Sequence, residues 1–157
     1  AAVKEVAAKP GVKAIIFKSP CIAIVKPLGK AEVRRQGSAV TVLTYGTMVY
    51  VATAAAEDAG IDAEVIDLRT ISPMDRETIV ASVEKTGRIL IVHEAAKSFG
   101  AGAEIMAIVN EKAFLSLEAP PTRLTGFDTI FPLPRGEEHY IPTPARIEAK
   151  IRELAAY

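Results

Sequence analysis

The sequence has no tryptophan, one cysteine and two histidines among its 157 residues. A single cysteine, Cys21, excludes an internal disulfide bond and is typical of a reducing compartment, so we expect a cytoplasmic protein. No helix start or base lies near Cys21 in the sequence, which favours a small buried side chain over a reactive thiol. Two histidines and one cysteine that lie far apart also argue against a structural zinc site.

Charge of one sign is not in excess. Lys and Arg together number 19, as do Asp and Glu, and aromatic residues make up only 6% of the chain. Surfaces that bind nucleic acids are basic and often carry stacking rings, so we expect no nucleic-acid partner. No apolar run approaches the roughly 18 to 20 residues that cross a bilayer, and the first residues lack the order of a signal peptide. We therefore expect no membrane partner.

Alternating strand and helix patterns fill the sequence from residue 40 onward. Half of the residues are hydrophobic, and the length suits one domain with a full core. Predicted strands occupy residues 40–44, 63–68, 88–92 and 121–126, and predicted helices occupy 47–59, 72–87, 102–114 and the residues after Thr143. This alternation predicts right-handed parallel crossovers and a three-layer α/β/α domain.

The segment before the first of these strands is more polar. Residues 30–35 alternate polar and apolar side chains, and Gln36-Gly37-Ser38 is typical of a turn. We therefore predict a hairpin between residues 30–35 and 40–44. Its polar first arm is predicted to be an antiparallel edge strand.

Residues 1–27 form a separate unit in the sequence pattern. They suit a short helix, a Pro10-Gly11 break, and one or two short strands at 13–17 and 21–25. We interpret them as a helix-strand extension that precedes a domain spanning residues 28–157.

His93 and Glu94 follow the predicted strand 88–92 and are the first chemical candidates. They lie at the carboxyl end of a parallel strand, where such sheets place ligands. Adjacent strand residues point to opposite faces, so the two cannot act as a simple dyad. His93 could be a general base, but no nucleophile is linked to it by spacing. We favour a polar pair that hydrogen-bonds neighbouring loops or a partner subunit.

The glycines that follow do not form a dinucleotide fingerprint. Gly100 and Gly102 lack the third small residue of that motif, and Glu104 in the first helical turn would repel a phosphate. We expect these glycines to let the helix begin close to the sheet.

Arg69 is a further candidate, because it follows the predicted strand 63–68. Asp67 and Arg69 point to the same face and could pair across the turn. Arg69 either braces the loop into the Ser72-Pro73 helix start or anchors a neighbouring chain, since Arg is favoured at interfaces. Both alternatives stay open.

The longest irregular segment spans residues 127–142, FDTIFPLPRGEEHYIP. Phe127, Ile130, Phe131 and Tyr140 are costly to expose, so this loop is expected to cover an apolar surface. That surface belongs either to another chain or to the loop's own core.

Several stretches from Leu28 onward resemble a known family, in the family's order: PLGKAEVRRQG, VTVLTYGTMVYVA, AEVIDLRTISPMDRETIVASVEKTGRILIVHEA, GAGAEI and EAPPTRLTGFDTIFP. They resemble the C-terminal domain of the beta subunit of thiamine-diphosphate-dependent 2-oxo acid dehydrogenases, in the transketolase C-terminal domain family. The ending TRLTGFDTIFP…YIPTPARI is more similar to the branched-chain type than to the pyruvate type.

The resemblance implies a mixed, mostly parallel five-stranded sheet with one antiparallel edge strand. It also implies an assembly domain, because the family holds thiamine diphosphate and magnesium mainly in other domains. The isolated chain is then expected to be inactive and to bind neither cofactor alone. The implied partners are a second beta subunit across a two-fold axis, the alpha subunit of the oxidoreductase and the lipoyl-bearing acyltransferase.

No catalytic, cofactor-binding or metal-binding residue carries over from the family, so the site prediction is an interface. Its candidates are Arg69, His93, Glu94, Phe127, Phe131 and Tyr140.

Residues 1–27 depart from the family pattern. They are more similar to the end of the thiamine-binding domain of indolepyruvate ferredoxin oxidoreductases, which leaves a gene fragment, a small independent protein and an artificial fusion as alternatives. A small autonomous enzyme or ligand-binding protein is the alternative function, and it requires His93 to be exposed in a pocket at the strand ends.

Overall fold

The computed structural model describes residues 30–132 and 134–157. The predicted extension at 1–27, with Cys21, lies outside the described residues. The strands are β1 Glu32–Arg35, β2 Val40–Thr44, β3 Ala63–Asp67, β4 Ile89–Val92 and β5 Thr122–Leu124. They form one sheet in the order β1-β3-β2-β4-β5, in which only β1 is antiparallel to its neighbour. The mixed, mostly parallel five-stranded sheet with an antiparallel edge is therefore confirmed.

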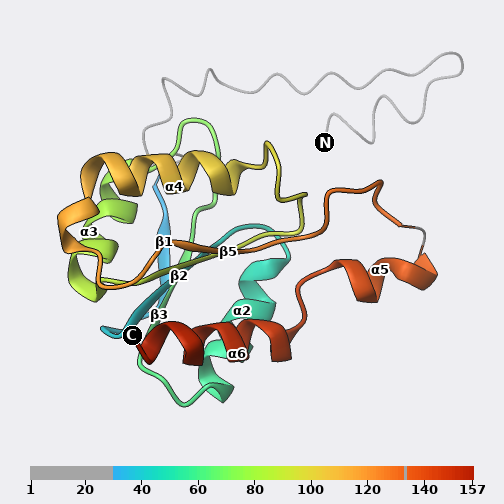
Figure 1. Ribbon diagram of the computed structural model, residues 1–157, viewed down its shortest axis with the longest axis horizontal. Coiled ribbons are helices and arrows are strands. Elements are labelled where there is room, and N and C mark those ends of the chain that lie inside the picture. Colours follow the sequence, from blue (N-terminus) through green and yellow to red (C-terminus); the bar gives the residue numbers. More distant parts are fainter. Residues whose placement is uncertain (1–29, 133) are drawn as a thin grey trace, which may run out of the picture.

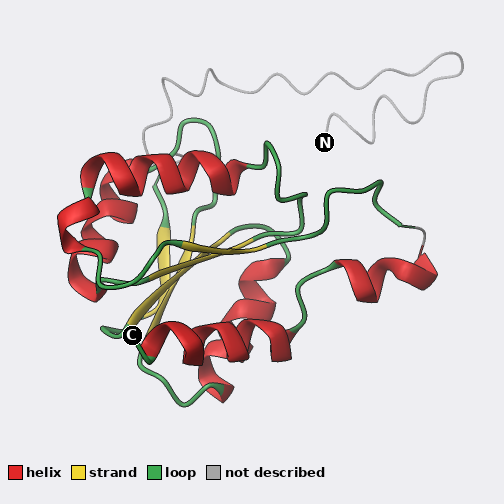
Figure 2. Cartoon of the chain, viewed as in Figure 1, coloured by secondary structure: helices red, strands yellow, loops and turns green. Residues whose placement is uncertain are grey.

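Helices cover both faces of this sheet, as Figures 1 and 2 show. The helices are α2 Met48–Asp58, α3 Arg76–Thr86, α4 Ala101–Lys112, α5 Pro134–Tyr140 and α6 Pro144–Ala155, with a short 3-10 turn, η2, at Phe114–Ser116. One core lies between the sheet and the α2–α6 pair, and a second core lies between the sheet and the α3–α4 pair. Every residue of β4 is buried, which is the burial expected of a parallel strand covered on both faces.

The predicted hairpin between the first two strands is wrong. β1 is the predicted antiparallel edge strand, but it pairs with β3, with Glu32 opposite Asp67, and β2 lies on the other side of β3. The connecting segment crosses the amino end of β3, where a Cβ on Gly37 would lie 2.3 Å from the carbonyl carbon of Ala63. The backbone N–H of Ser38 donates to the carbonyl of Asp62 at 3.0 Å, which holds this crossing in place.

The predicted 127–142 loop is also wrong in part, because residues Pro134–Tyr140 form helix α5. Pro134 takes the first helical position, where the backbone N–H that proline lacks would have no partner within the helix. Glu137 lies in the first turn, where a negative charge is favourable. Tyr140 then turns inward and is only 6% exposed.

Asp75 ties the start of α3 to the start of β1. Its carboxylate accepts hydrogen bonds from the backbone N–H of Thr78 at 3.2 Å, from the Thr78 hydroxyl at 2.7 Å and from the backbone N–H of Ala31 at 2.9 Å. Burial raises the pKa of Asp75, but these hydrogen bonds outweigh that effect and bring the pKa below its ordinary value. One side chain therefore caps the helix and anchors the edge strand.

We expect Asp75→Ala to lower the free energy of unfolding by about 2 kcal/mol, because it removes a helix cap and a second, part-buried hydrogen bond. The lowered pKa makes the contribution of Asp75 complete above the pKa of an unfolded Asp, about 3.9, and lost as the pH falls through the folded value. Urea denaturation at pH 7 measures the difference. The matched control is Glu77→Ala, since the side chain of Glu77 is 90% exposed. Equal stability of the two variants would contradict the double role of Asp75.

Candidate functional site

The loops that follow the four parallel strands gather at one edge of the sheet. We call this surface the carboxyl edge and define it as residues 45–47, 68–71, 93–100 and 125–131. Figure 1 shows the loops after β4 and β5 on the same side of the molecule as α5. Five of the six predicted interface residues lie on this edge, and the sixth, Tyr140, packs beneath it from α5.

His93 is the buried centre of this edge. It is fully buried, and its ring stacks on Tyr45 with centroids 5.8 Å apart and an interplanar angle of 17°. A Cβ on Gly102 would lie 2.5 Å from His93 Nε2, and one on Gly100 would lie 3.0 Å from Cε1. The two glycines therefore let α4 begin close to the sheet, as predicted, and the group they accommodate is the His93 ring.

The environment of His93 excludes the role that the alternative function requires. Burial lowers the pKa of His93, the backbone of Ala95 opposes this, and the nearby positive charge of Arg123 lowers the pKa further. Within residues 30–132 and 134–157, neither ring nitrogen has a hydrogen-bond partner. A fully buried His93 cannot be exposed in a pocket. Its hydrogen bonding to a neighbouring loop or to a partner subunit stays a prediction, since the Ala95 backbone lies close enough to raise its pKa.

Glu94 points to the surface instead. It is partly exposed and lines a cavity of about 330 Å³ with Tyr45, Gly46, Thr47 and Ala95. Burial raises the pKa of Tyr45, and the nearby charge of Glu94 adds to that effect. Glu94 makes no ion pair with a described residue.

Arg69 braces the edge strand rather than pairing with Asp67. Its guanidinium lies 3.7 Å from a carboxylate oxygen of Glu32 in β1 and is 49% exposed. The expected Asp67–Arg69 pairing takes another form, because the backbone N–H of Arg69 donates to Asp67 Oδ1 at 2.9 Å. Arg69 as an anchor for a neighbouring chain stays a prediction.

The aromatic residues after β5 divide into one buried ring and a group of exposed ones. Tyr140 donates its hydroxyl hydrogen to the carbonyl of Phe127 at 3.0 Å, and its ring contacts those of Phe127 and Phe131. Phe127 and Phe131 stay 52% and 48% exposed, and Ile130 stays 90% exposed. Tyr140 therefore packs in the interior of its own chain, whereas Phe127, Ile130 and Phe131 form apolar surface.

Sequence reasoning missed Phe99. It is the most exposed large apolar residue of the described chain, and its backbone has a φ of 58°, a left-handed conformation that is unfavourable for a bulky side chain. No pattern in the sequence indicates this orientation, because it arises from the turn that carries the chain around His93.

Two side-chain links join the loop after β4 to β5 and to the loop that follows β5. Asp128 accepts hydrogen bonds from the backbone N–H of Ser98 at 2.7 Å and from its hydroxyl at 2.8 Å, and the backbone bond is the main cause that lowers the pKa of Asp128. Arg123 Nη1 donates to the carbonyl of Lys97 at 2.8 Å. The two loops thus form one continuous surface.

A cationic pocket opens between these loops and α6. Lys97, Arg123 and Arg146 line it together with Phe127 and Asp128, and its volume is about 280 Å³. The guanidinium carbon of Arg146 lies 5.5 Å from the centroid of the Phe127 ring, a cation–π contact that fixes its position. The sequence did not reveal this pocket, because its cations come from three separate elements.

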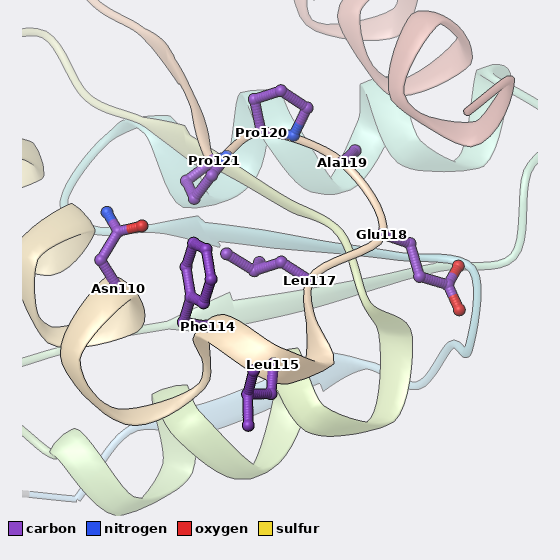
Figure 3. A pocket seen from close by; sticks show the side chains of 8 residues that line it. All are labelled: Asn110, Phe114, Leu115, Leu117, Glu118, Ala119, Pro120 and Pro121. Atoms are coloured by element: carbon purple, nitrogen blue, oxygen red, sulfur yellow. The ribbon is translucent and has the colours of Figure 1, made fainter.

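The opposite end of the strands carries a second apolar surface, drawn in Figure 3. This amino-edge groove has a volume of about 580 Å³ and is lined mainly by Phe114, Leu115, Leu117, Ala119, Pro120 and Pro121. Phe114 and Leu115 are 63% and 97% exposed. At the rim, Glu118 pairs with Arg88 at 2.8 Å.

Comparison with known proteins identifies the family. The transketolase C-terminal domain matches residues 29–147. The chain belongs to the transketolase C-terminal domain family. The expected resemblance is therefore confirmed, and the match takes in all five strands of the sheet and the start of α6.

Curated relatives of this transketolase C-terminal domain are beta subunits. It is 57% identical over 129 residues to the 2-oxoisovalerate dehydrogenase subunit beta of Pseudomonas aeruginosa, covering 82% of this chain and 36% of the relative. It is 52% identical over 132 residues to the pyruvate dehydrogenase E1 component subunit beta of Acholeplasma laidlawii, covering 82% of this chain and 40% of the relative. The chain thus spans about two fifths of the length of these relatives.

Solved structures agree on the fold. A split gene transketolase, described as an inactive beta4 tetramer, has a TM-score of 0.69 and 26% identity and covers 82% of this chain and 42% of its own. A 2-oxoglutarate:ferredoxin oxidoreductase from Magnetococcus marinus has a TM-score of 0.55 over 80% of this chain and 19% of its own. At 12% identity the second similarity concerns the fold alone.

Two further findings concern the described part of this transketolase C-terminal domain. It contains no group of three or more His, Cys, Asp or Glu residues placed to hold a metal ion. Among the helices that the structure describes, none is both long enough and apolar enough to cross a bilayer.

We expect the stability of the domain to fall between pH 7 and pH 5.5, in part through His93. An unfolded histidine has a pKa of about 6.5, and the folded value of His93 is lower, so the unfolded chain takes up the proton first as the pH falls. His93→Gln should therefore lose less unfolding free energy over this range than the wild-type chain. Urea denaturation at pH 7 and at pH 5.5 measures this change in the free energy of unfolding for each variant.

The control for this experiment is His139→Gln. The side chain of His139 is 82% exposed on α5, so this variant removes the other histidine and leaves the buried His93 in place. Identical slopes for His93→Gln and the wild type would show that His93 is not held neutral by burial.

Proposed function

We propose that this chain is the C-terminal assembly domain of the beta subunit of a 2-oxo acid dehydrogenase, of the branched-chain type. The relatives support the parent enzyme, since the 2-oxoisovalerate relative at 57% identity exceeds the pyruvate relatives at 52% and 49%. The observation that carries the assembly role is the collection of exposed aromatic and aliphatic side chains on one rigid edge of the sheet.

The proposal places the chemistry of the parent enzyme outside this domain. Thiamine diphosphate is bound through magnesium, which prefers carboxylate and other oxygen ligands in near-octahedral geometry. The described residues do not fit that requirement, because they offer no clustered set of ligands. His93 cannot contact a substrate either, because its ring is fully buried. Cofactor and substrate then belong to other domains of the parent enzyme.

The carboxyl edge is the proposed pairing surface between two copies. Its exposed Phe99, Phe127, Ile130 and Phe131 lie on two loops that the Ser98–Asp128 hydrogen bonds join, and exposed apolar side chains gathered in this way are typical of interaction sites. Aromatic residues and arginine are enriched in the energetically important centres of protein interfaces, and Arg146 lies against Phe127 here. The similar split gene transketolase is an assembly of beta chains, which supports self-association of this chain.

The amino-edge groove is the proposed docking surface for the lipoyl-bearing acyltransferase. It lies at the opposite end of the strands, so it stays accessible when two carboxyl edges pair. Its exposed Phe114 and Leu115 offer the apolar anchors that a transient partner needs. The alpha subunit completes the proposed parent assembly.

We expect the purified chain to form dimers in the micromolar range and Phe127→Ser to weaken the dimer by at least about tenfold, because Phe127 lies at the centre of the proposed interface. Sedimentation equilibrium measures the dissociation constant. Phe114→Ser removes a phenylalanine of comparable exposure, 63%, from the amino-edge groove and should leave the constant unchanged. Equal effects of the two substitutions, or a monomeric chain, would contradict the pairing surface.

A second measurement tests the location of the cofactor. Calorimetric titration of the chain with thiamine diphosphate and magnesium should give no binding heat up to millimolar ligand. A dissociation constant in the micromolar range would instead place a cofactor site within this chain.

A further inference from the structure

The carboxyl edge carries unpaired charges of both signs. Arg69, Arg76 and Arg88 each have a carboxylate within ion-pair distance, whereas Lys97, Arg123 and Arg146 have none within the described residues. Glu94, on the same edge, likewise lacks a described cation partner. The chain as a whole has no net charge, so this separation of charge is local.

Two of the three cations are held ready for an anion. Arg123 is fixed by its bond to the Lys97 carbonyl, and Arg146 is fixed by its contact with the Phe127 ring. The one carboxylate in the pocket, Asp128, is held by Ser98 and interacts electrostatically with Lys97, which leaves Arg123 and Arg146 for an added anion. Because the guanidinium groups lose little freedom on binding, they can present several N–H donors to a carboxylate at low entropic cost.

Glu94 and the cationic pocket are close neighbours on the edge. The backbone N–H of Gly126 donates to the carbonyl of Ala95 at 3.1 Å, and a Cβ on Gly126 would lie 2.4 Å from the carbonyl oxygen of Glu94. Ala95 lines the Glu94 cavity and Gly126 lines the cationic pocket, so one contact between loops connects the linings of the two. A two-fold axis that passes near this contact places each carboxylate opposite the cations of the other copy.

We propose that Glu94 of one copy inserts between Arg123 and Arg146 of a second copy, and that the second copy does the same in return. This inference deepens the proposed pairing of carboxyl edges and rests on it. The exposed rings of Phe127 and Phe131 flank the ion pairs and exclude water from them, which makes the pairs specific for a matching surface. A carboxylate on a second copy is thus the anion for which the pocket is built.

A charge exchange tests the reciprocal pairing. Glu94→Lys and Arg146→Glu should each weaken homodimer formation by at least about tenfold, because each places like charges opposite one another at two symmetric positions. An equimolar mixture of the two variants should form a heterodimer at least about tenfold tighter than either variant's homodimer, because the substituted positions 94 and 146 then face each other with opposite charge and the native Glu94 faces the native Arg146. The unchanged Arg123 still repels the substituted position 94, so the heterodimer should stay weaker than the wild-type dimer. Sedimentation velocity at 50 and 500 mM salt measures the dissociation constants. The gain in affinity of the mixture over the single variants should be smaller at 500 mM salt, because salt screens the charges.

The control is the same exchange at a remote site. Glu111→Lys and Lys112→Glu alter exposed charges at the end of α4, and neither residue has a described ion-pair partner. These variants should dimerise like the wild type, singly and mixed. Circular dichroism of all four variants checks the fold. We expect Glu94→Lys and Arg146→Glu to leave the fold intact. Glu94 lies in a loop, and a Glu at position 146 would suit the first turn of α6.

The possible results separate the two proposals. If the wild type dimerises but the mixture is no tighter than either variant, the Glu94 pairing is wrong and the carboxyl-edge interface can stand. If the wild type is monomeric, both are wrong. If millimolar inorganic phosphate dissociates the wild-type dimer and sodium chloride of equal ionic strength does not, the pocket is confirmed as an anion site of the interface. Phosphate binding without any effect on dimerisation would identify a small-anion pocket and overturn the proposal.

Discussion

The carboxyl edge depends on the burial of one ring. His93 directly follows β4, stacks on Tyr45 and fills the space that a side chain at Gly102 would occupy. This packing brings the start of α4 against the sheet and forces the intervening chain to turn outward. The outward turn carries Ser98 to Asp128 and leaves Phe99 fully exposed. The buried, neutral His93 therefore determines the shape of the carboxyl edge without being exposed on it.

From this constraint follows the kind of function that the domain can have. The loops after β4 and β5 are joined by hydrogen bonds, so they present aromatic and charged side chains in fixed positions. Rigid exposed aromatics beside fixed guanidinium groups suit the centre of a protein interface. The part of the chain that the structure describes offers no comparable arrangement around a reactive group, since His93 is buried and Glu94 faces the other way. This surface chemistry is the basis of the proposed assembly role.

Most of the fold was predictable because local patterns and long-range packing agree. Asp75 caps α3, Gly87 ends it in a left-handed conformation, and Ile147 and Ile151 mark the buried face of α6, as the sequence indicates. The partner of β1 was not predictable, because four mostly polar residues fit either neighbour and the choice rests on the contact of Gly37 with β3. The cationic pocket was hidden for another reason. Its three cations lie on different elements, and only the packed structure brings them together.

Hydrogen–deuterium exchange of the full chain, followed as a function of protein concentration, tests the central claim most directly. The account predicts that the backbone amides of residues 93–100 and 125–131 become protected as the dimer forms. Those of residues 114–121, at the amino-edge groove, should exchange at the same rate throughout. Protection confined to 114–121, or self-association without protection at the carboxyl edge, would contradict the claim that this edge is the assembly surface.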